Sequence, residues 1–105
     1  MKVAVNMQHP LIMALHKIVC DTYGCAESEI HSQPDTHVKK VTVFILCHFF
    51  GYQKCDVARP YLINCLYVPT VVRNCQTLYA VSDNFRDKVK TILDYLELNY
   101  EETTA

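Results

Sequence analysis

Only two glycines occur among the 105 residues, and each one follows an apolar stretch with helical spacing. The first stretch opens at Pro10, a residue suited to the first position of a helix, and Gly24 provides a stop. Between them the apolar residues recur with the period of one helical face: Leu11, Met13, Ala14, Ile18, Val19 and Tyr23. A β-sandwich would need more turn residues than this chain has. The sequence therefore predicts a small all-α domain.

The second apolar stretch is predicted to be a central helix from Pro34 to Phe50, capped by Ser32 and stopped by Gly51. Residues 41–47 are β-branched and apolar enough to form a buried strand instead. The length of the stretch favours a helix, as does its apolar face, which comprises Val38, Val41, Ile45 and Phe49. Because the stretch is apolar on most sides, its neighbours should wrap around it.

Further helical segments fill the rest of the chain. Cys25–Ile30 is predicted to form a short helical turn. A segment from Lys54 should end at Asn64 in the left-handed conformation, with Pro60 near its first turn. Ser82 should cap the last helix, whose buried stripe would be Phe85, Val89, Ile92, Leu93 and Leu96. The prediction is one domain of five to six helices over residues 1–105, with a lead-in arm (1–9) and a frayed tail (101–105).

Composition limits the function. Lysine and arginine almost balance aspartate and glutamate, giving a net charge of −1. Because phosphate neutralisation supplies most non-specific affinity for nucleic acid, this balance counts against strong non-specific DNA binding. The basic residues nevertheless gather in the middle of the chain and could form a locally positive face: Lys39, Lys40, Lys54, Arg59 and Arg73.

The six cysteines are predicted to be free, mostly buried thiols. No signal peptide opens the chain, which favours a cytoplasmic location in which disulfides are rare. No pair has the spacing of a zinc or redox motif, so neither a metal nor a cofactor is expected. The longest apolar run, residues 41–50, contains His48 and is too short to span a membrane.

Residues 54–80 have the outline of a helix-turn-helix, with two helical segments joined by a short turn near Asn64–Tyr67. The second segment, Pro69–Ala80, has an apolar inner face formed by Val71, Val72, Cys75, Leu78 and Tyr79. Its predicted outer face carries Thr70, Arg73, Asn74 and Thr77. Side chains of these types bind base edges and phosphates, although an ordinary solvated helix face has the same pattern.

The landmarks of almost the whole chain, about Leu11 to Leu96, follow a known order. They are Tyr23-Gly24-Cys25 at a helix end, Val38-Lys39-Lys40-Val41 in the central helix, Val68–Cys75 entering the second helix of the motif, and Ser82–Arg86 at the closing helix. This order resembles the C-terminal DNA-binding domain of the bacterial replication initiator DnaA, a Trp-repressor-like helix-turn-helix. The resemblance implies a DNA-binding scaffold in which Lys39 stands at the family's usual basic position.

The chain departs from the family at functional positions. Apolar Leu66, Tyr67 and Val68 replace charged residues in the turn, Pro69 replaces the first of two threonines, and residues 33–35 lack the family's basic cluster. The resemblance therefore does not imply recognition of the initiator's usual DNA site.

Two functions follow as expectations. The first is sequence-specific binding of double-stranded DNA, in replication or transcription, by a stand-alone helix-turn-helix protein. In it Thr70, Arg73, Asn74 and Thr77 would contact bases or phosphates, and Lys39, Lys40 and Lys54 the DNA backbone. The alternative is a helical module that binds a protein or dimerises through Leu66, Tyr67 and Val68, because exposed apolar patches mark contact surfaces. Catalysis is not expected, since no constellation of catalytic residues is recognisable.

Overall fold

The computed structural model describes residues 7–31 and 36–104, with side chains described as far as residue 97. The described residues contain five α-helices and one 3-10 helix and no strand, so the predicted all-α class is confirmed. The helices are α1 (Pro10–Tyr23), η1 (Glu27–Glu29), α2 (His37–His48), α3 (Lys54–Ala58), α4 (Val68–Val81) and α5 (Asp83–Thr104). No helix in the described ranges is both long and apolar enough to cross a membrane.

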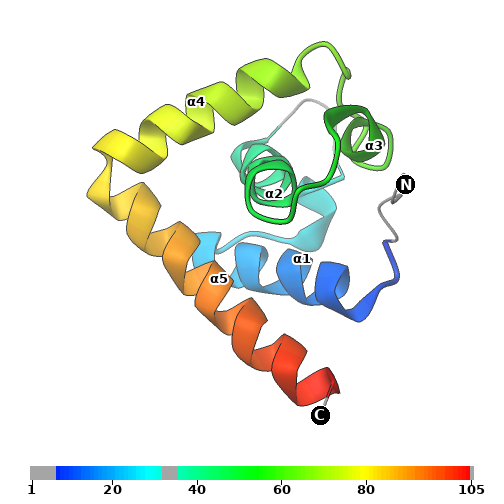
Figure 1. Ribbon diagram of the computed structural model, residues 1–105, viewed down its shortest axis with the longest axis vertical. Coiled ribbons are helices and arrows are strands. Elements are labelled where there is room, and N and C mark those ends of the chain that lie inside the picture. Colours follow the sequence, from blue (N-terminus) through cyan, green and yellow to red (C-terminus); the bar gives the residue numbers. More distant parts are fainter. Residues whose placement is uncertain (1–6, 32–35, 105) are drawn as a thin grey trace.

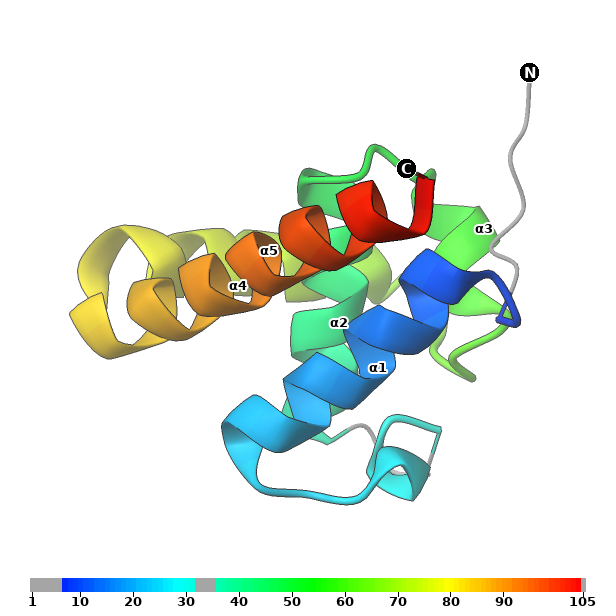
Figure 2. The same cartoon turned by 90° about the horizontal axis from the view of Figure 1, so that it is seen from below.

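Helix α2 is the centre of the fold. Figure 1 shows it end-on, with α4 above and α1 below, and Figure 2 shows α1 in front of it. Six consecutive residues, 41–46, are buried because other helices cover α2 on most sides. The predicted central helix is therefore confirmed, although Phe49 at its end is 36% exposed and lies outside the core.

Helix α2 is shorter than predicted. The side chain of Thr36 caps it by accepting a hydrogen bond from the Lys39 N–H at 3.3 Å. The predicted cap Ser32 and the predicted first-turn residue Pro34 lie outside the described residues. At the other end Gly51 adopts the left-handed conformation, with a φ of 77°, as its predicted role as a stop requires.

Helix α1 has the predicted bounds, and its predicted apolar face packs against the core except at Met13: Val19 is buried, and Leu11, Ala14, Ile18 and Tyr23 are partly buried. Its buried residues are Ile12, Leu15, His16, Val19 and Cys20, whereas Met13, predicted to be inside, is 55% exposed. His16 was predicted to lie on the polar face, and this was wrong. The imidazole is buried because Tyr61 supplies a hydrogen-bond partner inside the core.

The predicted segment Lys54–Asn64 ends early. Helix α3 stops at Ala58, two residues before Pro60, which has no N–H to donate. Nine residues, 59–67, then connect Ala58 to Val68. The left-handed residue in this connection is Leu62, with a φ of 57°, and not Asn64 as predicted.

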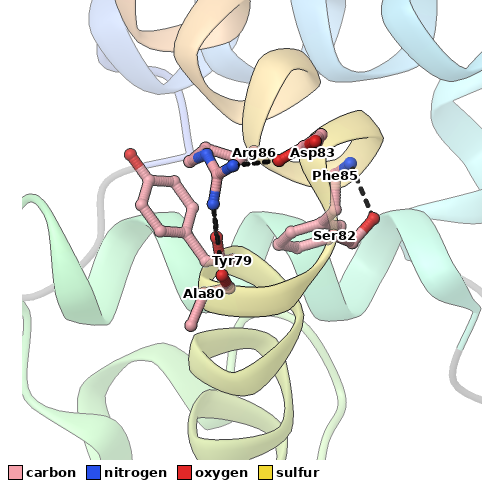
Figure 3. A network of polar contacts seen from close by, with 6 residues as sticks. All are labelled: Tyr79, Ala80, Ser82, Asp83, Phe85 and Arg86. Atoms are coloured by element: carbon pink, nitrogen blue, oxygen red, sulfur yellow. Dashed lines mark hydrogen bonds and ion pairs between the residues drawn. The ribbon is translucent and has the colours of Figure 1, made fainter.

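Helices α4 and α5 meet at Ser82, which caps α5 as predicted: its Oγ accepts a hydrogen bond from the Phe85 N–H at 3.2 Å. Arg86 donates to the carbonyls of Tyr79 and Ala80 at the end of α4 and forms an ion pair with Asp83 (Figure 3). The predicted stripe residues Phe85, Val89, Ile92 and Leu96 are buried and Leu93 is partly so. The helix continues to Thr104, and the predicted fraying of residues 101–105 stays a prediction.

Candidate functional site

The predicted outer face of α4 lies on the surface. Arg73, Asn74 and Thr77 are exposed, and Thr70 is half-buried near the start of the helix. The inner face consists of Val68, Val71, Val72 and Cys75, all buried. Leu78 was predicted to face inward, and this was wrong, because it is 39% exposed. The structure thus brings the four predicted polar residues together along one solvent-facing helix.

The three predicted lysines do not all reach this surface. Lys39 is completely buried, so its predicted contact with a DNA backbone is wrong: α2 is covered on the side where Lys39 lies. Lys40 is half-buried, and its Nζ lies 5.8 Å from the centre of the Tyr67 ring, a cation–π distance. Lys54 is exposed at the start of α3.

The connection 59–67 differs from the short turn expected in a helix-turn-helix, which has three or four residues. A tight turn does exist at its end, where the Tyr67 N–H donates to the Asn64 carbonyl at 2.8 Å. The Asn64 side chain strengthens this turn, since its Oδ1 accepts from the Leu66 N–H at 2.9 Å. Helices α3 and α4 are therefore joined by a longer segment than the sequence suggested.

The connection exposes apolar side chains. Leu66 is 87% exposed, Leu62 53% and Tyr67 36%. Val68 was grouped with this patch in the prediction, and this was wrong, because Val68 is fully buried as the first residue of α4. Leu62 was not predicted to belong to this patch, and its backbone is left-handed.

Two of the six cysteines form a disulfide, Cys55–Cys65, with their Cα atoms 5.2 Å apart. The prediction of free thiols was wrong for this pair. It ties α3 to the connection 59–67. The remaining thiols are free: Cys20 and Cys75 are buried, and Cys25 and Cys47 are half-buried.

A surface pocket of about 440 Å³ lies beside this disulfide, between α2, the start of α3, and α4. Its lining residues are Cys47, His48, Tyr52, Gln53, Lys54, Cys55, Val72 and Gln76. The Gln76 side chain donates to His48 Nδ1 at 3.1 Å, joining α4 to the end of α2. Burial raises the pKa of the Cys47 thiol to about 11, and the positive charge of Lys54 lowers it by a smaller amount. Sequence spacing could not reveal this pocket, because its walls come from separate elements.

A second polar cluster lies inside the protein. His16 Nε2 is 2.7 Å from the hydroxyl of the fully buried Tyr61, and His31 stacks on the Tyr61 ring at 6.0 Å. Burial, with a smaller effect of His31, lowers the pKa of His16 to about 4, so the imidazole is neutral at physiological pH. Burial raises the pKa of Tyr61. The pair is buried and joins α1 to the connection 59–67.

The described residues contain no group of three His, Cys, Asp or Glu side chains placed to hold a metal ion. No protein-family model, curated protein or solved structure matches this chain. The resemblance to the initiator domain therefore depends on the sequence landmarks alone.

Proposed function

We propose that the protein is a stand-alone helix-turn-helix-like protein that binds double-stranded DNA in a sequence-specific way, with α4 in the major groove. The observation that supports this is the exposed face of α4, where Arg73, Asn74 and Thr77 project together into solvent. Arginine pairs with the edge of guanine and asparagine with that of adenine, and threonine can contact either a base or a phosphate. Thr70 completes the face at the end where the connection 59–67 enters α4.

Few cations support this face. With Lys39 buried and Arg73 assigned to a base edge, Lys40 and Lys54 are left to contact phosphates. Two phosphate contacts give a slope of about −2 in log affinity against log salt concentration, much shallower than for a strongly basic repressor. Affinity then depends on base contacts, so weak binding to random DNA and tighter binding to a selected sequence are expected.

Selection of duplexes from a random library, followed by fluorescence anisotropy at several salt concentrations, tests the proposal. Arg73→Ala and Asn74→Ala should each weaken binding to the selected duplex about 5- to 100-fold, the loss of one base contact. Lys17→Ala is the matched control: Lys17 is exposed on α1, on the other side of α2 from α4. No enrichment, together with no binding in about 50 mM salt, would refute the proposal, since phosphate contacts are strongest there.

The function implies a cytoplasmic location, where chromosomal DNA is accessible. Disulfides are rare in that compartment because its reductants open them. In this setting the Cys55–Cys65 pair would be mainly reduced.

A second candidate function is association with another copy of the chain through the connection 59–67, without DNA binding. The supporting observation is the exposure of Leu62 and Leu66 in a segment held by the disulfide at Cys65. Such a preorganised apolar surface loses little conformational entropy when it binds. Sedimentation velocity over a wide concentration range tests this: a dimer that Leu66→Ser dissociates supports it, and a monomer at every concentration refutes it.

A further inference from the structure

The pocket between α2, α3 and α4 contains a free thiol and one end of a disulfide. Cys47, near the end of α2, and Cys55, in α3, both line it, whereas Cys65 does not. A thiol that attacks a disulfide bonds to one sulfur and displaces the other. An attack from inside the pocket requires the attacked sulfur to face the pocket and the leaving sulfur to lie outside it. Cys55 and Cys65 meet these two requirements in turn.

We propose that this pocket is a thiol–disulfide exchange site, in which Cys47 attacks Cys55 and displaces Cys65. The Cys47 thiol first loses its proton to solvent. Its sulfur then forms a bond to Cys55 Sγ as the Cys55–Cys65 bond breaks, and Cys65 leaves as a thiolate that takes up a proton. One disulfide and one thiol are present before and after the step, so no external oxidant or reductant is needed.

The surroundings of Cys47 keep this exchange slow at neutral pH. The thiolate is the attacking species, and a pKa of about 11 leaves roughly one thiol in ten thousand ionised at pH 7. Lys54 favours the thiolate because its positive charge lies near it. The neighbouring His48 imidazole contacts other side chains: it is hydrogen-bonded to Gln76 and stacked on Phe44, and it is not assigned as a base for Cys47.

The exchange would change what α3 is tied to. In the present form Cys55 holds the connection 59–67, and in the exchanged form it would hold the end of α2 instead. Release of Cys65 removes the covalent link between α3 and the segment that presents Leu62 and Leu66. The inference concerns the disulfide alone and does not depend on DNA binding.

Trapping the displaced thiol tests the proposal. The protein is purified without reductant and incubated with iodoacetamide, an alkylating agent, at pH values from about 7 to about 10, where thiolate attack accelerates about tenfold per unit. Peptide mass spectrometry then distinguishes two products. Exchange gives a Cys47–Cys55 disulfide with alkylated Cys65, and it should form faster as the pH rises. Alkylated Cys47 with an intact Cys55–Cys65 bond as the only product at every pH would overturn the proposal.

Variants separate exchange from general unfolding. Cys47→Ser should abolish labelling of Cys65, whereas Cys25→Ser, which removes another half-buried thiol outside the pocket, should leave it unchanged. Lys54→Met retains all six cysteines and should slow the exchange roughly two- to threefold by removing one nearby charge. Should Cys47→Ser fail to fold, the Lys54 variant decides: an unchanged rate of Cys65 labelling contradicts attack from this pocket.

Discussion

The two ends of helix α4 are connected in different ways. At its C-terminal end a single residue, Ser82, separates it from α5, and the hydrogen bonds of Ser82 and Arg86 at this junction join residues close in sequence. The Ser82 hydroxyl caps α5, and Arg86 reaches back to the last carbonyls of α4 (Figure 3). Such caps each contribute about 1 kcal/mol, and local sequence alone specifies them.

The N-terminal end of α4 depends on partners that are distant in sequence. Tyr61, in the connection 59–67, bonds to His16, 45 residues earlier. The disulfide joins Cys65 to Cys55 in α3, and Leu62 adopts a backbone conformation unusual for leucine. We infer that one end of α4 is fixed by many small local contacts and the other by a few large ones. Changes at the connection 59–67 should therefore have the larger effects.

The largest effect is expected from Tyr61→Ala. The substitution removes a fully buried aromatic ring, so the free energy of unfolding should fall by about 3–5 kcal/mol. Urea denaturation measures it. Tyr95→Ala, at a tyrosine that is 37% exposed on α5, is the control and should lose much less. Equal losses for the two variants would contradict the view that the connection is held by this side chain.

The disulfide comes next. The bonded cysteines are 10 positions apart, and closure of a loop of this size stabilises a fold by about 3 kcal/mol in the chain-entropy description. The double variant Cys55→Ser, Cys65→Ser should lose about that amount relative to the oxidised protein. Thermal unfolding with and without reductant supplies the control: reductant should destabilise the natural chain and leave the double variant unaffected. A double variant as stable as the oxidised protein would refute this role of the bond.

Acid should destabilise the same region through His16. Its pKa is about 4 in the folded protein and near 6.5 in the unfolded chain, so the unfolded chain binds the proton more tightly. The contribution of His16 to the free energy of unfolding is fully present well above pH 6.5 and is lost as the pH drops towards 4. The loss is about 2 kcal/mol at pH 5. Urea denaturation at each pH measures the loss. His16→Gln should make the free energy of unfolding almost independent of pH between 4 and 6.5. The same pH dependence in this variant would contradict burial of a neutral imidazole.

The sequence predicted the elements that local chemistry controls. Gly24 and Ser82 end or begin helices wherever they occur in a suitable pattern, and the structure places both as predicted. Periodicity also identified Arg73, Asn74 and Thr77 as the exposed face of α4. An amphipathic helix packs its apolar face against the core, so its polar face must point to solvent.

Features set by tertiary contacts could not be predicted. Lys39 was assigned to the DNA backbone because it belongs to a cluster of basic residues and stands at the basic position that the resemblance implies, yet α2 is covered on almost every side. The pairing of Cys55 with Cys65 depends on how the connection 59–67 folds back, and spacing alone does not determine it. The pocket at Cys47 was missed for the same reason, since three helices build it.

A moderate effect is expected at the C-terminal end of α4. Ser82→Ala removes the side-chain acceptor of the Phe85 N–H and should lower the free energy of unfolding by about 1 kcal/mol. Ser82→Asp keeps an acceptor at this position and should retain most of the stability. Chemical denaturation of the two variants measures the difference. A loss for Ser82→Ala as large as that for Tyr61→Ala would remove the distinction between the two ends of the helix.

The smallest effect is expected at Leu62, where the informative result is whether a substitution raises or lowers the free energy of unfolding. A leucine with a φ of 57° is strained by roughly 1–2 kcal/mol, which glycine would relieve. Glycine also gives the unfolded chain more freedom, an opposing effect of roughly 0.4–1 kcal/mol. Leu62→Gly should thus change stability by less than about 1 kcal/mol, in the stabilising direction.

Leu66→Gly is the matched control for this substitution. Leu66 is also exposed and its φ is not positive, so only the opposing effect of glycine applies and the variant should be destabilised. The difference between the two glycine variants, measured by urea denaturation, isolates the backbone strain at Leu62 from the loss of a leucine side chain. Equal destabilisation by both would mean that the connection 59–67 does not hold Leu62 in the left-handed conformation in solution.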